Sequence, residues 1–204
     1  MSKPLEPTHD CPLCPRLMAF RQEQRARHPD WFNAPVPCFG PRDAAIAIAG
    51  LAPGLQGANR TGRPFTGDWA GDLLFDTLLK LKLARGRYEE RADDTLTLVN
   101  IRIVNSVRCV PPQNKPETSE INTCRRFLIS ELEHMPRLKV ILALGKIAHD
   151  SVLRTYGKKI SAHPFKHGGG YDMGPVTLIS SYHCSRYNTN TGVLTTEMFE
   201  DVVG

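Results

Sequence analysis

Residues 50–68 read GLAPGLQGANRTGRPFTGD, and the rest of the chain is arranged around this stretch. The apolar run 44–49 before it predicts a buried strand, and 69–83 after it carries apolar residues at helical spacing. Its five glycines let the backbone approach a ligand closely. Long loops inside compact domains are usually functional, and ligands of α/β sheets lie beyond the carboxyl ends of the strands. The sequence therefore predicts an active site in this strand–loop–helix unit.

The size and charge of the chain set its broad class. Its 204 residues suit one domain spanning 1–204, and it contains no apolar run of about 18 residues that would span a membrane. Residues 1–10 are polar and lack the apolar segment of a secretory signal, so we expect a cytoplasmic protein. The net charge of +5 suits a polyanionic partner such as nucleic acid, although solvated helix faces carry similar arginine clusters.

Strands and helices alternate along the chain. Strands are expected at 44–50, 95–104, 139–144 and 176–181, and helices at 17–27, 69–83, 117–134, 145–156 and 195–203. This alternation predicts an α/β fold, a three-layer α/β/α arrangement around a central four-stranded, mainly parallel sheet. The loops after the first, second and fourth strands then gather at one edge of the sheet. Their polar and aromatic candidates are Asn59, Phe65, Asp68, Asn105, His183 and Asn188.

Four of the six cysteines form a pattern that suits a metal site. Cys11 and Cys14 have the spacing at which one turn directs two thiolates at a metal. Cys109 and Cys124 are separated by fourteen residues, enough for the chain to return to the same point. Four thiolates hold either a structural zinc or an iron–sulfur cluster, and spacing does not choose between them. Unrelated buried thiols are the third alternative, and the other two cysteines are expected to be free.

The glycine-rich loop and the four cysteines together resemble the iron–sulfur uracil-DNA glycosylases, over nearly the whole chain. The match is with the family-5, or b-type, branch. GLAPG at 50–54 and NRTGRPFTGD at 59–68 are similar to its first motif, and 105–112 resembles the segment with its third cluster cysteine. Other branches carry a carboxylate early in this motif, where this chain has Leu51 and Ala52. The resemblance implies a uracil-DNA glycosylase-like fold and one 4Fe–4S cluster on the four cysteines.

Cleavage of an N-glycosidic bond requires the base to be flipped out of the duplex. Phe65 can stack on the flipped base, although a core phenylalanine is the alternative. Asn105 can donate to uracil O4 and accept from N3–H, a pattern that cytosine reverses, although it could instead cap a turn. By the resemblance, Ala52, Gly54 and Asn188 are further candidates for substrate binding. Hypoxanthine presents the same edge as uracil, so we expect a broad specificity for deaminated bases.

Two side chains are the main candidates for the chemistry of bond cleavage. His183 could stabilise the departing uracil anion by donating to its O2, although a structural histidine is the alternative. Asp68 is the only acid in the loop, and Asn59 could position a water. Asp68 equally suits the N-cap of the helix that follows it, and the resemblance favours a catalytic role. A dissociative route through an oxocarbenium-like sugar needs little help from a base.

The expected partner is DNA containing uracil or other deaminated bases, bound by a monomer at the nucleoid of a prokaryote. Arg60 and Arg63 are candidates for phosphate contacts, and Arg186 and Tyr187 for a wedge that fills the gap left by the flipped base. Each of these could also be a solvated side chain. Two functions stay open. One is a monofunctional glycosylase that leaves an abasic site, since no Schiff-base lysine is evident; the other is a non-catalytic iron–sulfur nucleic-acid-binding module.

Overall fold

Residues 3–204 are described by a computed structural model. The strands are β1 (Ile46–Gly50), β2 (Ala84–Arg85), β3 (Thr97–Leu98), β4 (Ile101–Asn105), β5 (Val140–Leu144), β6 (Gly170–Asp172) and β7 (Thr177–Ser181). The helices are α1 (Pro15–Arg27), α2 (Ala58–Thr61), α3 (Trp69–Lys80), α4 (Thr118–Glu133), α5 (Lys146–Thr155), α6 (Arg186–Asn190) and α7 (Thr196–Val203), with short 3-10 turns η1 (Pro112–Asn114) and η2 (Ile160–Ala162).

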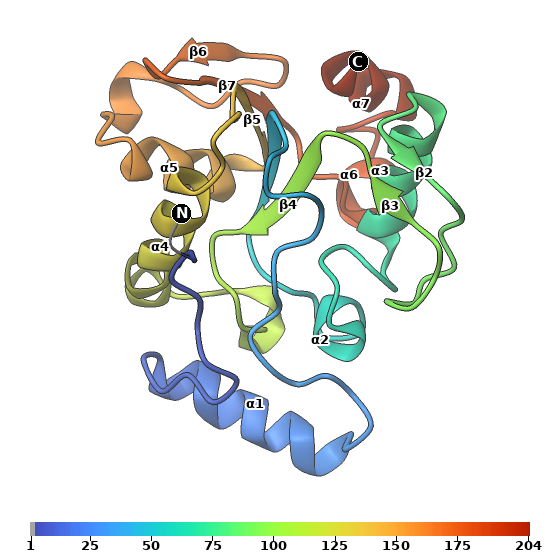
Figure 1. Cartoon of the computed structure of the whole chain (residues 1–204), viewed down its shortest axis with the longest axis vertical. Helices are drawn as coiled ribbons and strands as arrows, with labels where there is room; N and C mark the ends of the chain where they lie inside the picture. Colours follow the sequence, from blue (N-terminus) through green and yellow to red (C-terminus); the bar gives the residue numbers. More distant parts are fainter. Residues whose placement is uncertain (1–2) are drawn as a thin grey trace.

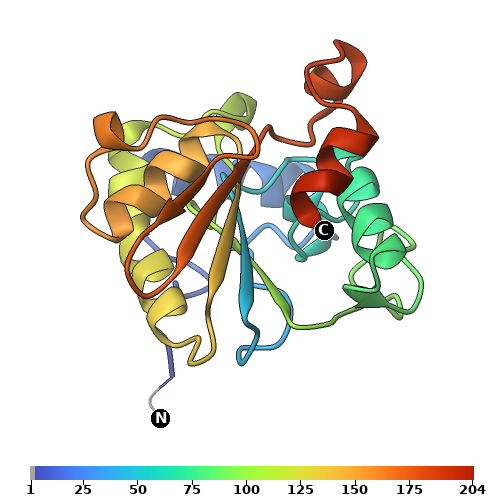
Figure 2. The same ribbon diagram turned by 90° about the horizontal axis from the view of Figure 1, so that it is seen from above.

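The strands form a central sheet between two layers of helices. Five strands are hydrogen-bonded in the order β4-β1-β5-β7-β6, and all but β6 run parallel (Figure 1). In the second view, α4 and α5 cover one face of the sheet, and α3 and α7 cover the other (Figure 2). The three-layer α/β/α arrangement expected from the sequence is therefore confirmed.

The carboxyl ends of the parallel strands meet at one edge of the sheet. Gly50 at the end of β1 lies beside Asn105 at the end of β4, and Leu144 of β5 lies beside Ser181 of β7. The loops after β1, β4 and β7 therefore leave the sheet on the same side, as the alternation of elements predicts. That is the side on which α1 and α2 lie (Figure 1).

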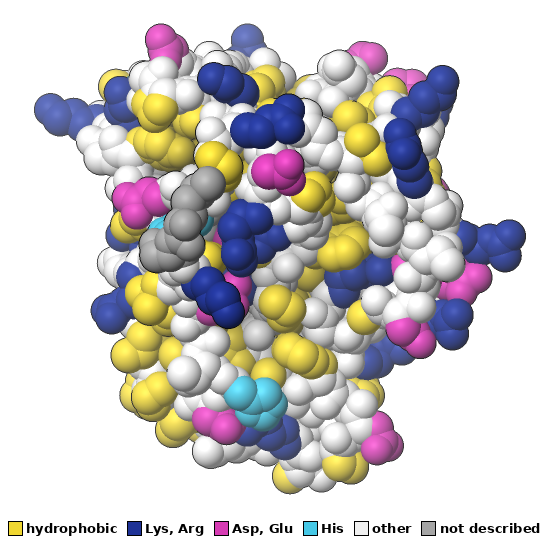
Figure 3. All heavy atoms as spheres, viewed as in Figure 1, with side chains coloured by type: hydrophobic (Ala, Val, Ile, Leu, Met, Phe, Trp, Pro, Cys, Tyr) yellow, Lys and Arg dark blue, Asp and Glu magenta, His cyan; other side chains and the backbone are white. Residues whose placement is uncertain are grey.

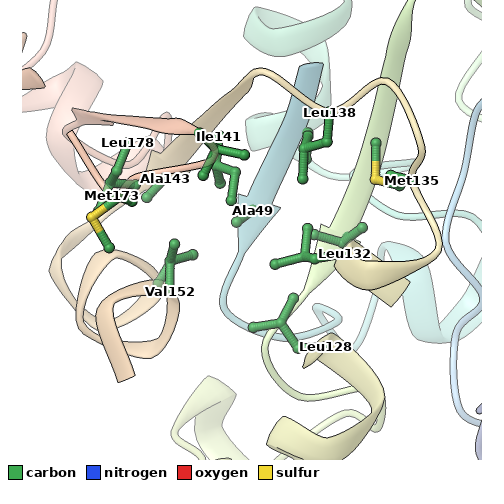
Figure 4. Close-up of a cluster of buried hydrophobic side chains, with 14 of the residues drawn as sticks. Ala49, Leu128, Leu132, Met135, Leu138, Ile141, Ala143, Val152, Met173 and Leu178 are labelled. Carbon is green, nitrogen blue, oxygen red and sulfur yellow. The ribbon is translucent and has the colours of Figure 1, made fainter. Parts of the chain in front are cut away.

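Apolar side chains fill both interfaces between the sheet and its helices. On one face, Leu132 of α4 and Val152 of α5 belong to the same buried cluster as Ile141 of β5 (Figure 4). On the other face, Phe75 of α3 and Phe199 of α7 are fully buried in a second cluster. This double coverage explains why the central strands are apolar along their whole length.

Two strands differ from the expectation. The strand expected at 95–104 is divided into β3 and β4, because Asn100 takes a left-handed φ of 57° and accepts a hydrogen bond from the Ala45 N–H at 2.8 Å. β3 pairs with β2 in a separate antiparallel ribbon. β6 is antiparallel to β7 and gives the sheet a fifth strand, so the expected count of four is wrong. It is three residues long and begins at a glycine, which is why its sequence is typical of a loop.

Candidate active site

The loops that follow β1, β4 and β7 enclose a cavity of about 380 Å³. Phe65, Asn105 and His183 all line it, although they lie far apart in the sequence. Ala52 and Gly54 of the glycine-rich loop line the same cavity. The side chains expected to stack on a base, to recognise its edge and to stabilise its departure therefore share one space.

Close packing around Gly50 fixes two of these side chains. A Cβ at this position would lie 2.4 Å from Asn105 Oδ1 and 2.9 Å from Phe65 Cζ, so only glycine fits. Phe65 takes a left-handed φ of 53°, which is unfavourable for a bulky residue, and it is 8% exposed. Its ring centroid lies 6.1 Å from that of His183, with the two planes inclined by 28°. The phenyl ring is thus held in one orientation at the wall of the cavity.

Asn105 supplies an amide that is buried without being fully hydrogen-bonded. It ends β4 and is 5% exposed. Its Oδ1 has no hydrogen-bond partner within residues 3–204. Leaving a buried acceptor unpaired costs about 1–3 kcal/mol. The geometry therefore suits a ligand that donates a hydrogen bond to this oxygen.

His183 follows β7 and presents a neutral imidazole to the cavity. Burial lowers its pKa to about 4, because desolvation disfavours the charged ring. Asn188 holds the backbone here, since its Nδ2 donates to the His183 carbonyl oxygen at 2.8 Å. Gly145 packs closely as well: a Cβ there would lie 3.3 Å from His183 Cβ. Asn188 does not line the cavity, so the structure gives it a positioning contact rather than the expected place on the substrate.

Asp68 both caps a helix and faces the cavity. Its Oδ1 accepts a hydrogen bond from the Gly71 N–H at 3.2 Å, at the N-cap of α3. Its Oδ2 lies against Gly54 and Gly57, where added Cβ atoms would come within 2.8 and 2.2 Å of it. Burial raises the pKa of this carboxyl group. The capping and catalytic roles that the sequence left open are therefore compatible in one side chain.

Two candidate residues are buried away from the cavity. Asn59 is fully buried, and its Nδ2 donates to Asn33 Oδ1 at 2.8 Å, so it does not lie where it would position a water in the cavity. Arg63 is 5% exposed, donates to Asp94 at 2.6 Å and lies 5.0 Å from the Phe39 ring centroid. Its interpretation as a phosphate contact is therefore wrong. Both side chains fix the loop to distant segments, which the local sequence does not reveal.

Exposed aromatic and basic side chains lie at the mouth of the cavity. Arg186 lines the cavity, with its Cζ 5.5 Å from the centroid of the Trp69 ring. Tyr187 is 74% exposed and Arg60 is exposed as well, but neither of them lines the cavity. Sequence reasoning missed Trp69, which lines the cavity, is 46% exposed and donates from Nε1 to Thr189 Oγ1 at 2.9 Å. Its signal is an aromatic residue at the first position of a helix, directly after the glycine-rich loop.

Basic side chains do not form a single patch on the face seen in Figure 3. Lys and Arg are spread over this face and are interspersed with acidic and hydrophobic side chains (Figure 3). Among the described residues, Arg186 is the one Lys or Arg side chain that lines the cavity. The modest net charge of +5 agrees with this distribution.

The four patterned cysteines line a second, smaller cavity beside α1. Cys11 and Cys14 from the N-terminal turn meet Cys109 and Cys124 there, and all four are free thiols. Burial raises the pKa of Cys14 to about 11 and that of Cys124 to about 12. Across the described residues, no group of three or more His, Cys, Asp or Glu side chains has the arrangement that holds a metal ion. The convergence of the four thiols is nevertheless that expected from their spacing.

Comparisons with known proteins give consistent matches. A family model described as the uracil DNA glycosylase superfamily matches residues 37–203. The chain is 45% identical over 200 residues to the type-5 uracil-DNA glycosylase of Thermus thermophilus, covering 95% of this chain and 90% of that protein. It is 37% identical to the type-5 uracil-DNA glycosylase of Pyrobaculum aerophilum, covering 95% and 86%. It is also 39% identical to the type-5 uracil-DNA glycosylase of Mycobacterium bovis, in a match that covers 94% of this chain and 75% of that protein.

Proposed function

Because the chain belongs to the uracil DNA glycosylase superfamily, we propose that it hydrolyses the N-glycosidic bond of uracil in DNA and leaves an abasic site. The observation that carries this proposal is the meeting of Phe65, Asp68, Asn105 and His183 around one cavity. A base that is buried in a duplex stack has to be extruded into such a space before its glycosidic bond can react. These four residues offer the cavity a phenyl ring, an amide, a neutral imidazole and a carboxyl group for that purpose.

Recognition of uracil rests on stacking and on one amide. Stacking of a base on an aromatic ring such as that of Phe65 is worth ~1–3 kcal/mol, which offsets much of the cost of flipping. The unpartnered Oδ1 of Asn105 accepts from uracil N3–H, and the amide nitrogen donates to O4. Cytosine offers an acceptor at N3 and a donor at N4, so it would leave both ends of the amide unpaired. A site of this kind rejects the wrong base strongly.

Bond cleavage uses His183 and Asp68 in different ways. The neutral imidazole of His183 donates a hydrogen bond to uracil O2 and stabilises the negative charge that develops there as the base departs. Asp68 faces the cavity, where its carboxylate can orient the attacking water and stabilise an oxocarbenium-like sugar. Its raised pKa makes it a stronger base than an exposed aspartate. The Gly71 N–H holds the carboxyl group in place for this role.

We further propose that the substrate range extends to hypoxanthine. Its N1–H and O6 repeat the edge that Asn105 reads in uracil. Leu51 and Ala52 line the cavity at the positions where other branches carry a carboxylate, so no charged side chain there opposes a larger base. Contacts with the DNA outside the flipped base would come from Arg60 and Arg186 to phosphates, and from exposed Tyr187 as a wedge.

We also propose that the four cysteines hold one 4Fe–4S cluster, which takes four thiolate ligands. The residues fit this group, because all four thiols line one cavity and two N–H groups donate to them. Arg21 Nη1 donates to Cys109 Sγ at 3.1 Å, and the Arg108 backbone N–H donates to Cys124 Sγ at 3.3 Å. The cluster would link three parts of the chain covalently, namely the N-terminal turn, the helix α4 and the segment that follows β4. It would take part in no step of the hydrolysis.

A duplex with a single uracil tests the proposed activity. We expect strand cleavage only after treatment with alkali, because a monofunctional glycosylase leaves the backbone intact at the abasic site. His183→Ala should reduce turnover far more than DNA affinity, and His9→Ala, at an exposed histidine, is the matched control. Binding of the duplex by the wild-type protein without release of uracil would instead favour the non-catalytic nucleic-acid-binding module.

The remaining expectations concern the location of the protein in the cell, its oligomeric state and its division into domains. No helix within residues 3–204 is long and apolar enough to cross a membrane. We propose a monomer that acts at the nucleoid in the cytoplasm of a prokaryote, because its substrate is DNA. The assignment of residues 1–204 to a single domain also stays a prediction.

A further inference from the structure

The α1 helix buries an arginine against the four cysteines. Arg21 is 1% exposed and is the largest of the fully buried side chains in the described chain. Its Nη1 donates to Cys109 Sγ at 3.1 Å, and its Nη2 donates to the Cys11 carbonyl oxygen at 3.1 Å. Its Nε is buried without any hydrogen-bond partner within residues 3–204. The guanidinium is therefore directed at the cysteine site and is only partly satisfied by the protein.

No carboxylate within the described residues balances the charge of Arg21. Neighbouring arginines of the same helix do have acidic partners: Arg16 pairs with Glu120, and Arg25 pairs with Asp10. A buried charge without a counter-charge is strongly unfavourable, and natural proteins pair such groups or place them on bound ions. The position of Arg21 therefore calls for an anion that the polypeptide itself does not provide.

Arg108 is a second buried arginine that lines the cavity of the four cysteines. It is 3% exposed, donates from Nε to the Val36 carbonyl oxygen at 2.6 Å and from Nη1 to Cys38 Sγ at 3.1 Å. It has no carboxylate partner in the part of the chain that the structure describes. Two buried positive charges thus lie beside four cysteines.

Neutral thiols cannot balance these charges, whereas metal-bound thiolates can. A thiol is only a weak hydrogen-bond acceptor and carries no charge. Four thiolates carry more negative charge than the oxidised core of a 4Fe–4S cluster cancels, so the bound group is anionic as a whole. Attraction between that group and a guanidinium at hydrogen-bond distance compensates for the removal of both from water.

We infer that Arg21 is the fixed counter-charge of the cysteine site and that it is required for the site to retain its iron–sulfur group. This inference rests on the proposed cluster. A positive charge beside a cluster favours the more negative, reduced state, so Arg21 should also raise the reduction potential. Arg21 is thus a positioning and charge-balancing residue that does not touch the DNA substrate.

Removal of Arg21 should have a different consequence if the cysteines are ordinary thiols than if they hold a cluster. If the cysteines are ordinary thiols, Arg21→Met removes an unpaired buried charge and keeps the volume filled, so the protein should be as stable or more stable. If the cysteines hold a cluster, the same change leaves an anionic group uncompensated. Retention of iron should then fall.

The experiment measures release of iron from protein purified without air. Iron and sulfide content are determined first, and the loss of cluster absorbance is then followed in the presence of a ferrous chelator. We expect Arg21→Met to lose its cluster about 10-fold faster or more, the scale typical of changes beside metal ligands. Arg21→Lys, which keeps the charge, should be closer to wild type than Arg21→Gln, and its reduction potential should be higher than that of Arg21→Gln.

Arg25→Met is the matched control, because Arg25 lies one turn further along α1 and pairs with Asp10 at 2.5 Å rather than with sulfur. Equal retention of iron by wild type and Arg21→Met would overturn the inference, and so would equally fast loss from Arg25→Met. If Arg21→Met cannot be purified, equal release rates for Arg21→Gln and Arg21→Lys would overturn it as well. A wild-type protein that holds no iron would instead remove the cluster proposal, so the two failures are distinguishable.

Discussion

His183 is partly buried, and the desolvation of its ring makes the stability of the protein depend on pH in a defined direction. Burial lowers its pKa from the ordinary value of 6.5 to about 4. Between these two values the unfolded chain binds a proton that the folded protein does not bind. The free energy of unfolding therefore falls as the pH is lowered through this range, and the contribution is fully present only above about pH 6.5.

The size of the effect follows from the two pKa values. One pKa unit corresponds to about 1.4 kcal/mol, so the contribution of His183 should fall by about 2 kcal/mol between pH 7 and pH 5. The total loss of unfolding free energy should reach about 3 kcal/mol below pH 4, where both the folded and the unfolded protein are protonated. This is a large fraction of the stability of an ordinary domain.

Urea unfolding of wild type and His183→Gln at a series of pH values measures this effect. Glutamine does not titrate, and subtracting the two curves removes the contributions of all other titrating groups. We expect the unfolding free energy of wild type minus that of His183→Gln to fall by about 2 kcal/mol from pH 7 to pH 5. A difference that stays constant over this range would mean that the ring is hydrated and titrates normally. The imidazole would then not be a neutral hydrogen-bond donor in the cavity.

Four further predictions follow from individual contacts. Gly57→Ala places a Cβ 2.2 Å from Asp68 Oδ2, so single-turnover rates should fall about 10- to 100-fold, whereas Gly170→Ala, with no atom within 4 Å, should be neutral. Arg63→Met should lower the urea-derived unfolding free energy by about 3 kcal/mol, because its buried carboxylate partner loses its counter-charge. Arg60→Gln should leave stability unchanged and reduce the slope of log affinity against log salt by about 1. Removal of iron by a chelator should lower the melting temperature measured by circular dichroism, and equal melting temperatures before and after its removal would argue against a structural cluster.

The parts of the site that the sequence predicts are those set by local pattern and topology. A glycine-rich loop between a buried strand and a helix places the cavity, because parallel strands all end at one edge. The positions of Asn105 and His183 just after apolar runs predict that both lie at that edge. The parallel strands bring Asn105 and His183 to one edge, and the packing of the loop against Gly50 brings Phe65 to the same cavity.

The parts that the sequence does not predict depend on partners that are distant in the chain. Arg63 lies in the same loop as the exposed Arg60, and it is held inside by the ion pair with Asp94 and by packing of its guanidinium over the Phe39 ring. Asn59 is buried by a hydrogen bond to Asn33, which lies in a segment without regular structure. Neither contact leaves a local pattern, so a charged or polar residue of this loop cannot be assigned to the surface from its neighbours.

The cysteine site and the base-binding cavity share one stretch of backbone. The Val107 N–H donates to the Leu51 carbonyl oxygen at 2.8 Å. Hydrogen bonding between the β1 and β4 segments therefore continues beyond the carboxyl ends of these two strands. Leu51 and Ala52 pack against the apolar cluster that contains Cys109, and they also line the cavity. Asn105 lies on the same segment, one short turn before that cysteine. If the four cysteines hold the proposed cluster, that group would immobilise the backbone that carries the Asn105 amide, without taking part in the proposed reaction. Its loss should disturb discrimination between uracil and cytosine before it abolishes DNA binding.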